Sequence, residues 1–100
     1  MKFLVTTKAH AVQQGMTSAI VQATQEMADR DIKNGVIDVL YAFADGSGSV
    51  GIANADSGEA LAQSLLGLPA APFFDFEARP LAEFNKVVNL RLDALKKNGL

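Results

Sequence analysis

The chain has 100 residues, of which 49% are apolar and 20% are charged, with a formal net charge of −2, one histidine and no cysteine. This size and composition indicate one globular domain and exclude the strongly basic surface typical of nucleic-acid binding. The absence of cysteine excludes thiolate zinc sites, thiol nucleophiles and disulfides. The chain shows neither a signal-peptide pattern nor a run of about 18 apolar residues, so we expect a cytoplasmic protein.

The first expected elements are a short strand and a helix. Residues 3–7 are partly β-branched and predict a strand, and residues 8–12 form a connection. Apolar residues then recur at steps of three and four, which predicts a helix over residues 16–33. The residues of this stripe are Met16, Ile20, Ala23 and Met27. Asn34 and Gly35 come next, which is typical just past a helix end.

A hairpin is expected after this helix. Residues 37–44 alternate with a period of two, and most of them are apolar, which predicts a strand covered on both faces. Residues 45–48 are Asp-Gly-Ser-Gly and predict a turn, and residues 49–54 form the returning strand. The pattern Gly-x-Gly-x-x-Gly over residues 46–51 leads into this strand and opens no helix, so it is not a dinucleotide-binding motif.

A second helix is expected next. Asp56 resembles a helix cap with Glu59 at the third helical position, the spacing of a capping box. The helical spacing of Leu61, Leu65 and Leu68 predicts the face that this helix buries.

Residues 67–77 form the most distinctive stretch, Gly-Leu-Pro-Ala-Ala-Pro-Phe-Phe-Asp-Phe-Glu. Pro69 and Pro72 cannot continue a helix and therefore predict an ordered exit from it. In the strand that follows, Phe74 and Phe76 fall on one face. A third helix is expected over residues 81–98. Its apolar stripe contains Leu81, Phe84, Val88, Leu92 and Leu95.

The expected order is β-α-β-β-α-β with an added C-terminal helix in one domain, residues 1–100. This is an α+β, ferredoxin-like arrangement with a four-stranded antiparallel sheet. Two helices would leave one apolar sheet face bare, and monomers rarely expose such a face. We therefore expect a homodimer or a higher homo-oligomer, with the third helix as a rival cover for the same face.

The stretch from residue 27 to residue 77 resembles the muconolactone isomerase-like family of dimeric α/β-barrel proteins. The resemblance is carried by Gly-Glu-Ala-Leu at residues 58–61, by Leu68-Pro69, and by Pro-Phe-Phe-Asp-Phe-Glu at residues 72–77. It implies a homodimer whose sheets pack face to face. For true isomerases it also implies a cofactor-free proton shift on a small lactone carboxylate.

The same resemblance implies a catalytic carboxylate on the first helix and an aromatic or hydroxyl partner on the sheet. The ungapped register places Thr24 at the position of that carboxylate. Glu26 lies two residues away and faces elsewhere on a helix. Tyr41 stands where the relatives carry an aromatic residue. The basic residues that the relatives carry around the second strand are missing here, which leaves little countercharge for an anionic lactone.

Three residues are candidates for proton transfer. His10 is either a base, because its usual pKa lies near neutrality, or an exposed loop histidine. Tyr41 shares a predicted face with Ile37, Val39 and Phe43, and is either a core tyrosine or a proton donor in a ligand pocket. Asp75 interrupts an apolar strand and is either a buried acid or a residue at the rim of the sheet.

Thr24, Asp38, Asn54 and Phe73 complete the candidate set as substrate-binding residues. Asp38 has the same two interpretations as Asp75, and Asn54 either donates to a substrate carbonyl or caps the following turn. One histidine and scattered carboxylates form no recognisable metal-ligand set, and no cofactor is expected.

The leading hypothesis is a cofactor-independent enzyme that isomerises, cyclises or otherwise moves a proton on a hydrophobic, aromatic or polyketide-type small molecule. The alternatives are a noncatalytic ligand-binding or assembly protein and a cofactor-free monooxygenase, both on the same fold.

Overall fold

The computed structural model describes residues 1–11 and 13–100, so Val12 in the expected connection lies outside the described residues. The elements in chain order are β1 (Lys2–Ala9), α1 (Ser18–Lys33), β2 (Ile37–Ala42), β3 (Gly48–Asn54), α2 (Gly58–Leu66), the short 3-10 helix η1 (Ala71–Phe73), β4 (Phe74–Leu81) and α3 (Phe84–Lys97). The strands form one antiparallel sheet in the order β2-β3-β1-β4. The predicted α+β, ferredoxin-like fold is confirmed.

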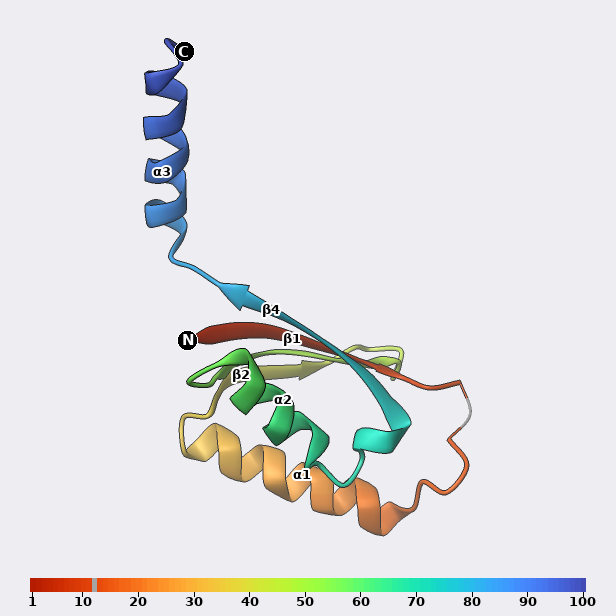
Figure 1. Ribbon diagram of the computed structural model, residues 1–100. Helices are drawn as coiled ribbons and strands as arrows, with labels where there is room; N and C mark the ends of the chain where they lie inside the picture. Colours follow the sequence, from red (N-terminus) through yellow and green to blue (C-terminus); the bar gives the residue numbers. More distant parts are fainter. Residues whose placement is uncertain (12) are drawn as a thin grey trace.

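Helices α1 and α2 lie on the same face of the sheet (Figure 1). The core between the two layers is small and contains Phe3, Val5, Ala53 and Leu61. Leu61 of α2 is only 5% exposed, and burying a leucine side chain fully contributes about 1.5–3 kcal/mol. Phe3 and Val5 are two residues apart on β1, so their side chains point to the same face of the sheet and both enter this core.

Strand β2 contains an irregularity that the alternation of its sequence does not reveal. Ile37 pairs with Ala53 while Val39 pairs with Ile52, so Asp38 is an extra residue opposite β3. A bulge of this kind reverses the faces of the residues on either side of it. The predicted common face of Ile37 and Tyr41 is therefore wrong: Ile37 faces the helices, whereas Val39 and Tyr41 face the other side.

The start of α2 also differs from the prediction by one residue. Ser57 is the N-cap, and its hydroxyl accepts a hydrogen bond of 3.1 Å from the backbone N–H of Ala60. Glu59 is consequently the second helical residue and not the third, and the predicted capping box with Asp56 is wrong. Ser57 satisfies one of the free backbone N–H groups of the helix start.

The proline-rich exit is ordered as predicted. Helix α2 ends at Leu66, Pro72 lies in the first turn of η1, and β4 starts directly afterwards at Phe74. Phe74 and Phe76 then face the helices. The third helix begins at Phe84 and not at Leu81, because Leu81 still pairs with Lys2 in the sheet.

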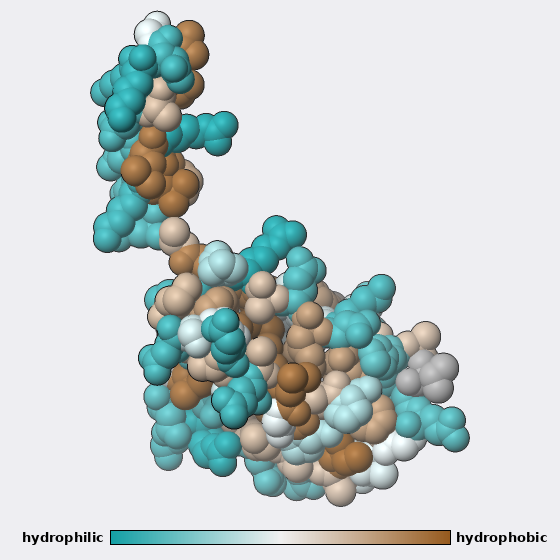
Figure 2. Space-filling model, in the orientation of Figure 1, coloured by the Kyte–Doolittle hydropathy of each residue, from teal (hydrophilic) through white to brown (hydrophobic). Residues whose placement is uncertain are grey.

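Helix α3 projects from the body at the end of β4 (Figure 1), and the molecule measures 60 × 30 × 24 Å. None of the 14 described residues of α3 is buried. Figure 2 shows apolar side chains gathered along this helix. The described helices include none that is long and apolar enough to cross a membrane. The sheet face opposite α1 and α2 also exposes apolar side chains, among them Val39, Tyr41 and Phe43.

Candidate active site

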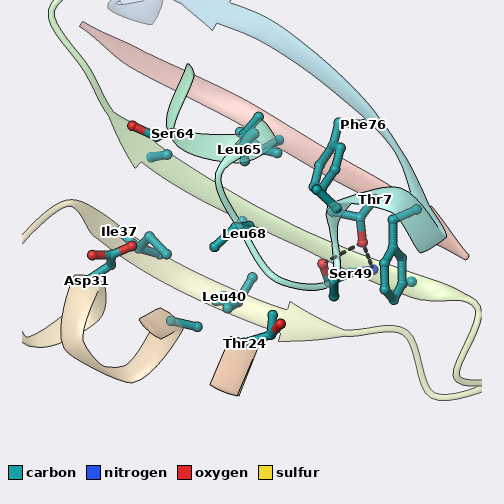
Figure 3. Close-up of a pocket in the computed structure, with 18 of the residues that line it drawn as sticks. Thr7, Thr24, Asp31, Ile37, Leu40, Ser49, Ser64, Leu65, Leu68 and Phe76 are labelled. Atoms are coloured by element: carbon teal, nitrogen blue, oxygen red, sulfur yellow. Dashed lines mark hydrogen bonds between the residues drawn. The ribbon is translucent and has the colours of Figure 1, made fainter. Parts of the chain in front are cut away.

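A cavity of about 350 Å³ lies between the sheet and the two helices that cover it. Its walls are largely apolar (Figure 3). The sheet contributes Val5, Leu40 and Phe76 among others, and α2 contributes Leu61 and Leu65. Concave apolar sites with a few polar groups are where small molecules bind in proteins, so this cavity is the candidate active site.

Helix α1 contributes polar side chains to the cavity. Thr17 caps this helix by accepting a hydrogen bond of 3.2 Å from the N–H of Ile20. Thr24, Ala28 and Asp31 all line the cavity. Their spacing of four and three residues places them on one face of the helix.

The hydroxyl groups of the cavity differ in how well they are satisfied. Thr7 and Ser49 share a hydrogen bond of 2.8 Å between their side-chain oxygens, and the Thr7 oxygen also accepts one of 3.0 Å from the Ser49 N–H. The Thr24 hydroxyl is buried and has no hydrogen-bond partner among the described residues. A buried polar group left unpaired costs about 1–3 kcal/mol. A ligand that bonds to Thr24 would recover that cost.

Asp31 is the only ionisable side chain among the described residues that line the cavity. Its side chain is 29% exposed, and the nearest cation in an ion pair is Arg30, whose Nε lies 4.0 Å from a carboxylate oxygen. A carboxylate beside an apolar cavity can accept a proton from a bound carbon acid. Asp31 was not among the predicted site residues, although Thr24 and Asp31 are seven residues apart and therefore share a helix face.

His10 and Asp75 are brought together, but outside this cavity lining. The His10 Nε2 lies 2.9 Å from an Asp75 carboxylate oxygen. Their side chains are 41% and 76% exposed. Phe73 lies beside this pair, since its backbone oxygen accepts hydrogen bonds of 2.9 Å from the His10 N–H and 3.2 Å from the Gln13 side chain.

Tyr41 is not brought together with these residues. It lies on β2, at the edge of the sheet opposite to the β4 edge that carries Asp75. Its side chain is on the face away from the cavity, and the residue is 68% exposed.

Asp38 and Asn54 contact one another at the end of the sheet. The Asn54 amide donates hydrogen bonds of 2.8 Å to Asp38 and 3.1 Å to the Gly35 carbonyl. Lys2 pairs with the Asp38 carboxylate and donates a hydrogen bond of 3.0 Å to Asn54. The Lys2 hydrogen bond, followed by that from Asn54, lowers the pKa of Asp38 below its usual value. Among the seven predicted site residues, Thr24 alone lines the described cavity.

The family model for muconolactone delta-isomerase matches residues 1–86. The chain belongs to the muconolactone delta-isomerase family. The predicted resemblance is thereby confirmed and extends beyond residues 27–77. No curated protein matches the chain.

Two solved structures place this family member in context. The crystal structure of muconolactone isomerase at 3.3 Å resolution is 26% identical, with a TM-score of 0.70, over 83% of this chain and 90% of that chain. The 5-chloro-2-hydroxyhydroquinone dehydrochlorinase from Burkholderia phenoliruptrix AC1100, in complex with 2,5-dihydroxybenzoquinone, is 16% identical, with a TM-score of 0.58, over 86% of this chain and 98% of that chain. The family and the first structure support an isomerase-type enzyme that acts on a small molecule, and the second shares the fold.

Among residues 1–11 and 13–100, no group of three or more His, Asp or Glu side chains could hold a metal ion.

Proposed function

We propose that this protein is a cofactor-independent isomerase-type enzyme that moves a proton on a hydrophobic small molecule, such as an aromatic or polyketide-type intermediate. The observation that carries the proposal is the apolar cavity of about 350 Å³ under α1 and α2 in a member of the muconolactone delta-isomerase family. Apolar walls keep water from the reacting carbon, and a positioned side chain exchanges the proton.

From the sequence, His10, Tyr41 and Asp75 are predicted to be the reacting groups. Asp38, Asn54 and Phe73 are predicted to contact the substrate. None of these six lines the described cavity. His10 and Asp75 form a pair in which the carboxylate orients the imidazole, as a general base requires.

The test uses muconolactone, the substrate named for the relative, and its uncharged methyl ester. Purified full-length protein in D2O, with a metal chelator added, is mixed with each compound and followed by proton NMR. We expect isomerisation, or exchange of carbon-bound hydrogen for deuterium, faster than in buffer for at least one compound. No isomerisation and no exchange with either compound would contradict the proposal.

A noncatalytic ligand-binding protein is the second candidate. Thr24 favours it, because this residue stands where the resemblance implies the catalytic carboxylate. Saturation-transfer NMR on the same samples separates the two candidates. Binding without isomerisation or exchange supports the second candidate, whereas chemical conversion of the bound compound excludes it.

We also propose that the protein is a homodimer or a higher homo-oligomer. The helix-free sheet face and the apolar side of α3 support this proposal. Val39 is 42% exposed and Leu92 of α3 is 46% exposed. A second copy of the chain is the partner that would bury both surfaces, because matching patches on identical chains form a symmetric interface.

A further inference from the structure

We infer that Asp31 is the proton-transfer residue of the cavity and that the cavity takes an uncharged single-ring carbonyl compound, with the Thr24 hydroxyl on its carbonyl oxygen. The inference rests on the proposed function and assigns its reacting group and its substrate class. The observation behind it is the pairing of one carboxylate and one unpartnered buried hydroxyl on the cavity-facing stripe of α1.

The spacing of the two residues matches the size of such a ligand. Asp31 follows Thr24 by seven residues, which is a separation of about 10 Å along the helix axis at 1.5 Å per residue. If the two functional groups keep the axial separation of their positions, contacts of about 3 Å at each end leave roughly 4 Å between the carbonyl oxygen and the reacting carbon. One ring carrying a conjugated carbonyl group spans that distance. Threonine in a helix populates two side-chain rotamers, so its hydroxyl can turn toward the cavity.

The proton transfer balances without another reactant. The Asp31 carboxylate takes a proton from a carbon conjugated with the ligand carbonyl, so that an O–H bond forms while a C–H bond breaks. The electron pair of that bond moves into the carbonyl and gives an enolate, which the Thr24 hydroxyl stabilises by donating a hydrogen bond. The proton then returns from Asp31 to a different carbon of the conjugated system, and the enolate electrons form the new C–H bond.

The charge of the cavity determines the class of substrate. The described lining residues include no Lys, Arg or His, and their only ionisable group is the Asp31 carboxylate. A ligand carboxylate would lose its hydration in the apolar cavity without gaining a cation, and Asp31 would repel it. An ester or a ketone of the same shape has no charge, so it neither loses the hydration of a carboxylate nor is repelled by Asp31.

The first experiment changes the carboxylate to its amide. Asp31→Asn keeps the shape of the side chain but cannot take a proton, and Asp29→Asn makes the same change at an exposed position of α1 outside the cavity. With muconolactone methyl ester in D2O, we expect Asp31→Asn to lose about 100-fold or more of the exchange rate and Asp29→Asn to keep it. Asp31→Glu, which restores a carboxylate, should recover part of the rate.

The second experiment measures binding, which needs no turnover. Saturation-transfer NMR titrations compare muconolactone with its methyl ester, two compounds that differ in one charge. The full-length wild type should bind the ester at least about tenfold more tightly, and Asp31→Asn should narrow that ratio because it removes the repulsion. Equal affinities in the wild type would overturn the assignment of an uncharged substrate.

The outcomes distinguish the inference from the proposed function. If the wild type converts the ester and folded Asp31→Asn converts it at the same rate, Asp31 is not the reacting group although the enzyme is an isomerase. If the wild type converts neither compound, the proposed function is wrong, and the assignment of Asp31 as the proton-transfer residue is wrong with it. Loss of exchange in Asp31→Asn with retained ester binding supports the inference, because the cavity is then intact and only the proton transfer is missing.

Discussion

Asp38 links neighbouring strands at the end of the sheet. Its carboxylate pairs with Lys2 from β1 and accepts a hydrogen bond from Asn54 of β3. These contacts favour the charged form and lower the pKa of Asp38. Because the folded pKa lies below the unfolded one, the stabilisation is present above the unfolded pKa and is lost as the pH falls through the folded pKa.

We predict that Lys2→Met raises the pKa of Asp38 toward its usual value and lowers the free energy of unfolding at neutral pH, and that this difference from the wild type disappears as the pH falls through the folded pKa of Asp38. Carbon-detected NMR titration of the side-chain carboxyl groups measures this directly. Asp45 provides the control, because its pKa is lowered by hydrogen bonds from Ser47 and not by Lys2. A pKa of Asp38 that stays the same in Lys2→Met would show that the ion pair does not form in solution.

We propose that Thr24 contributes to ligand binding at the expense of stability. We predict that Thr24→Val leaves the free energy of unfolding unchanged or raises it by about 1 kcal/mol, because the unpaired hydroxyl disappears. Turnover of the methyl ester should fall by about 100-fold, as expected for the loss of one donor to a developing oxyanion. Thr24→Ser keeps the hydroxyl and should retain most of the activity. Urea unfolding and the NMR assay check both parts.

At the scale of the elements, close approaches of the backbone constrain the sheet. A Cβ atom at Gly48 would lie 1.9 Å from the carbonyl oxygen of Thr7, and one at Gly51 would lie 2.7 Å from that of Val39. Both glycines lie on β3, which pairs with β1 on one side and β2 on the other. The packing of β3 between its neighbours therefore requires positions without side chains.

We predict that Gly48→Ala lowers the free energy of unfolding by about 1–3 kcal/mol, because the backbone of β1 must move to admit the methyl group. Gly58→Ala is the matched control, since a Cβ atom there has no neighbour within 4 Å among the described residues. At the first residue of α2 the same change should raise the stability by about 0.4–1 kcal/mol. Thermal and urea unfolding of the two variants compare these effects, and equal stabilities would contradict the account of β3.

The order and type of the strands and α-helices were predictable because they have a clear hydrophobic period and clear end signals, whereas the short helix η1 was not predicted. The bulge at Asp38 was not, because an extra residue in a strand with two apolar faces leaves no break in its pattern. The start of α2 differed by one residue, since Asp56 and Ser57 are both good N-caps and only the fold selects between them.

The site was less predictable than the fold. The sequence places Thr24 on α1, and the seven-residue spacing puts Asp31 on the same helix face, but nothing in the sequence shows that this face lines a cavity. His10 and Asp75 lie 65 residues apart and form a pair only because β1 and β4 are neighbours. Tyr41 turned out to lie on the other sheet face. Chemistry-bearing residues are therefore identifiable from the sequence, whereas their grouping depends on sheet order.

At the scale of the whole molecule, two apolar surfaces lie outside the cavity. The helix-free sheet face is one, and the stripe of α3 that contains Phe84, Val88, Leu92 and Leu95 is the other. A single helix that extends from the body and exposes an apolar side is only marginally stable in water. Burial against a second chain would stabilise it.

We predict that the full-length protein is a dimer or larger in sedimentation experiments and that Leu92→Glu shifts it toward the monomer. Lys97→Glu places the same charge on the opposite side of α3, because five residues correspond to about 140° of rotation. That variant should keep the wild-type assembly state. A wild type that sediments as a monomer at micromolar concentration would contradict the proposed homo-oligomer.

The cavity under α1 and α2 is the proposed place of reaction, and filling it with a larger side chain tests that proposal. Ala28 lines the cavity between Thr24 and Asp31, whereas Gln25 is exposed on the same helix. The measurement is the rate of muconolactone methyl ester conversion by Ala28→Phe and Gln25→Phe, each first shown to be folded by circular dichroism. We predict that Ala28→Phe loses the activity and that Gln25→Phe keeps it; a folded Ala28→Phe with the wild-type rate would contradict the account.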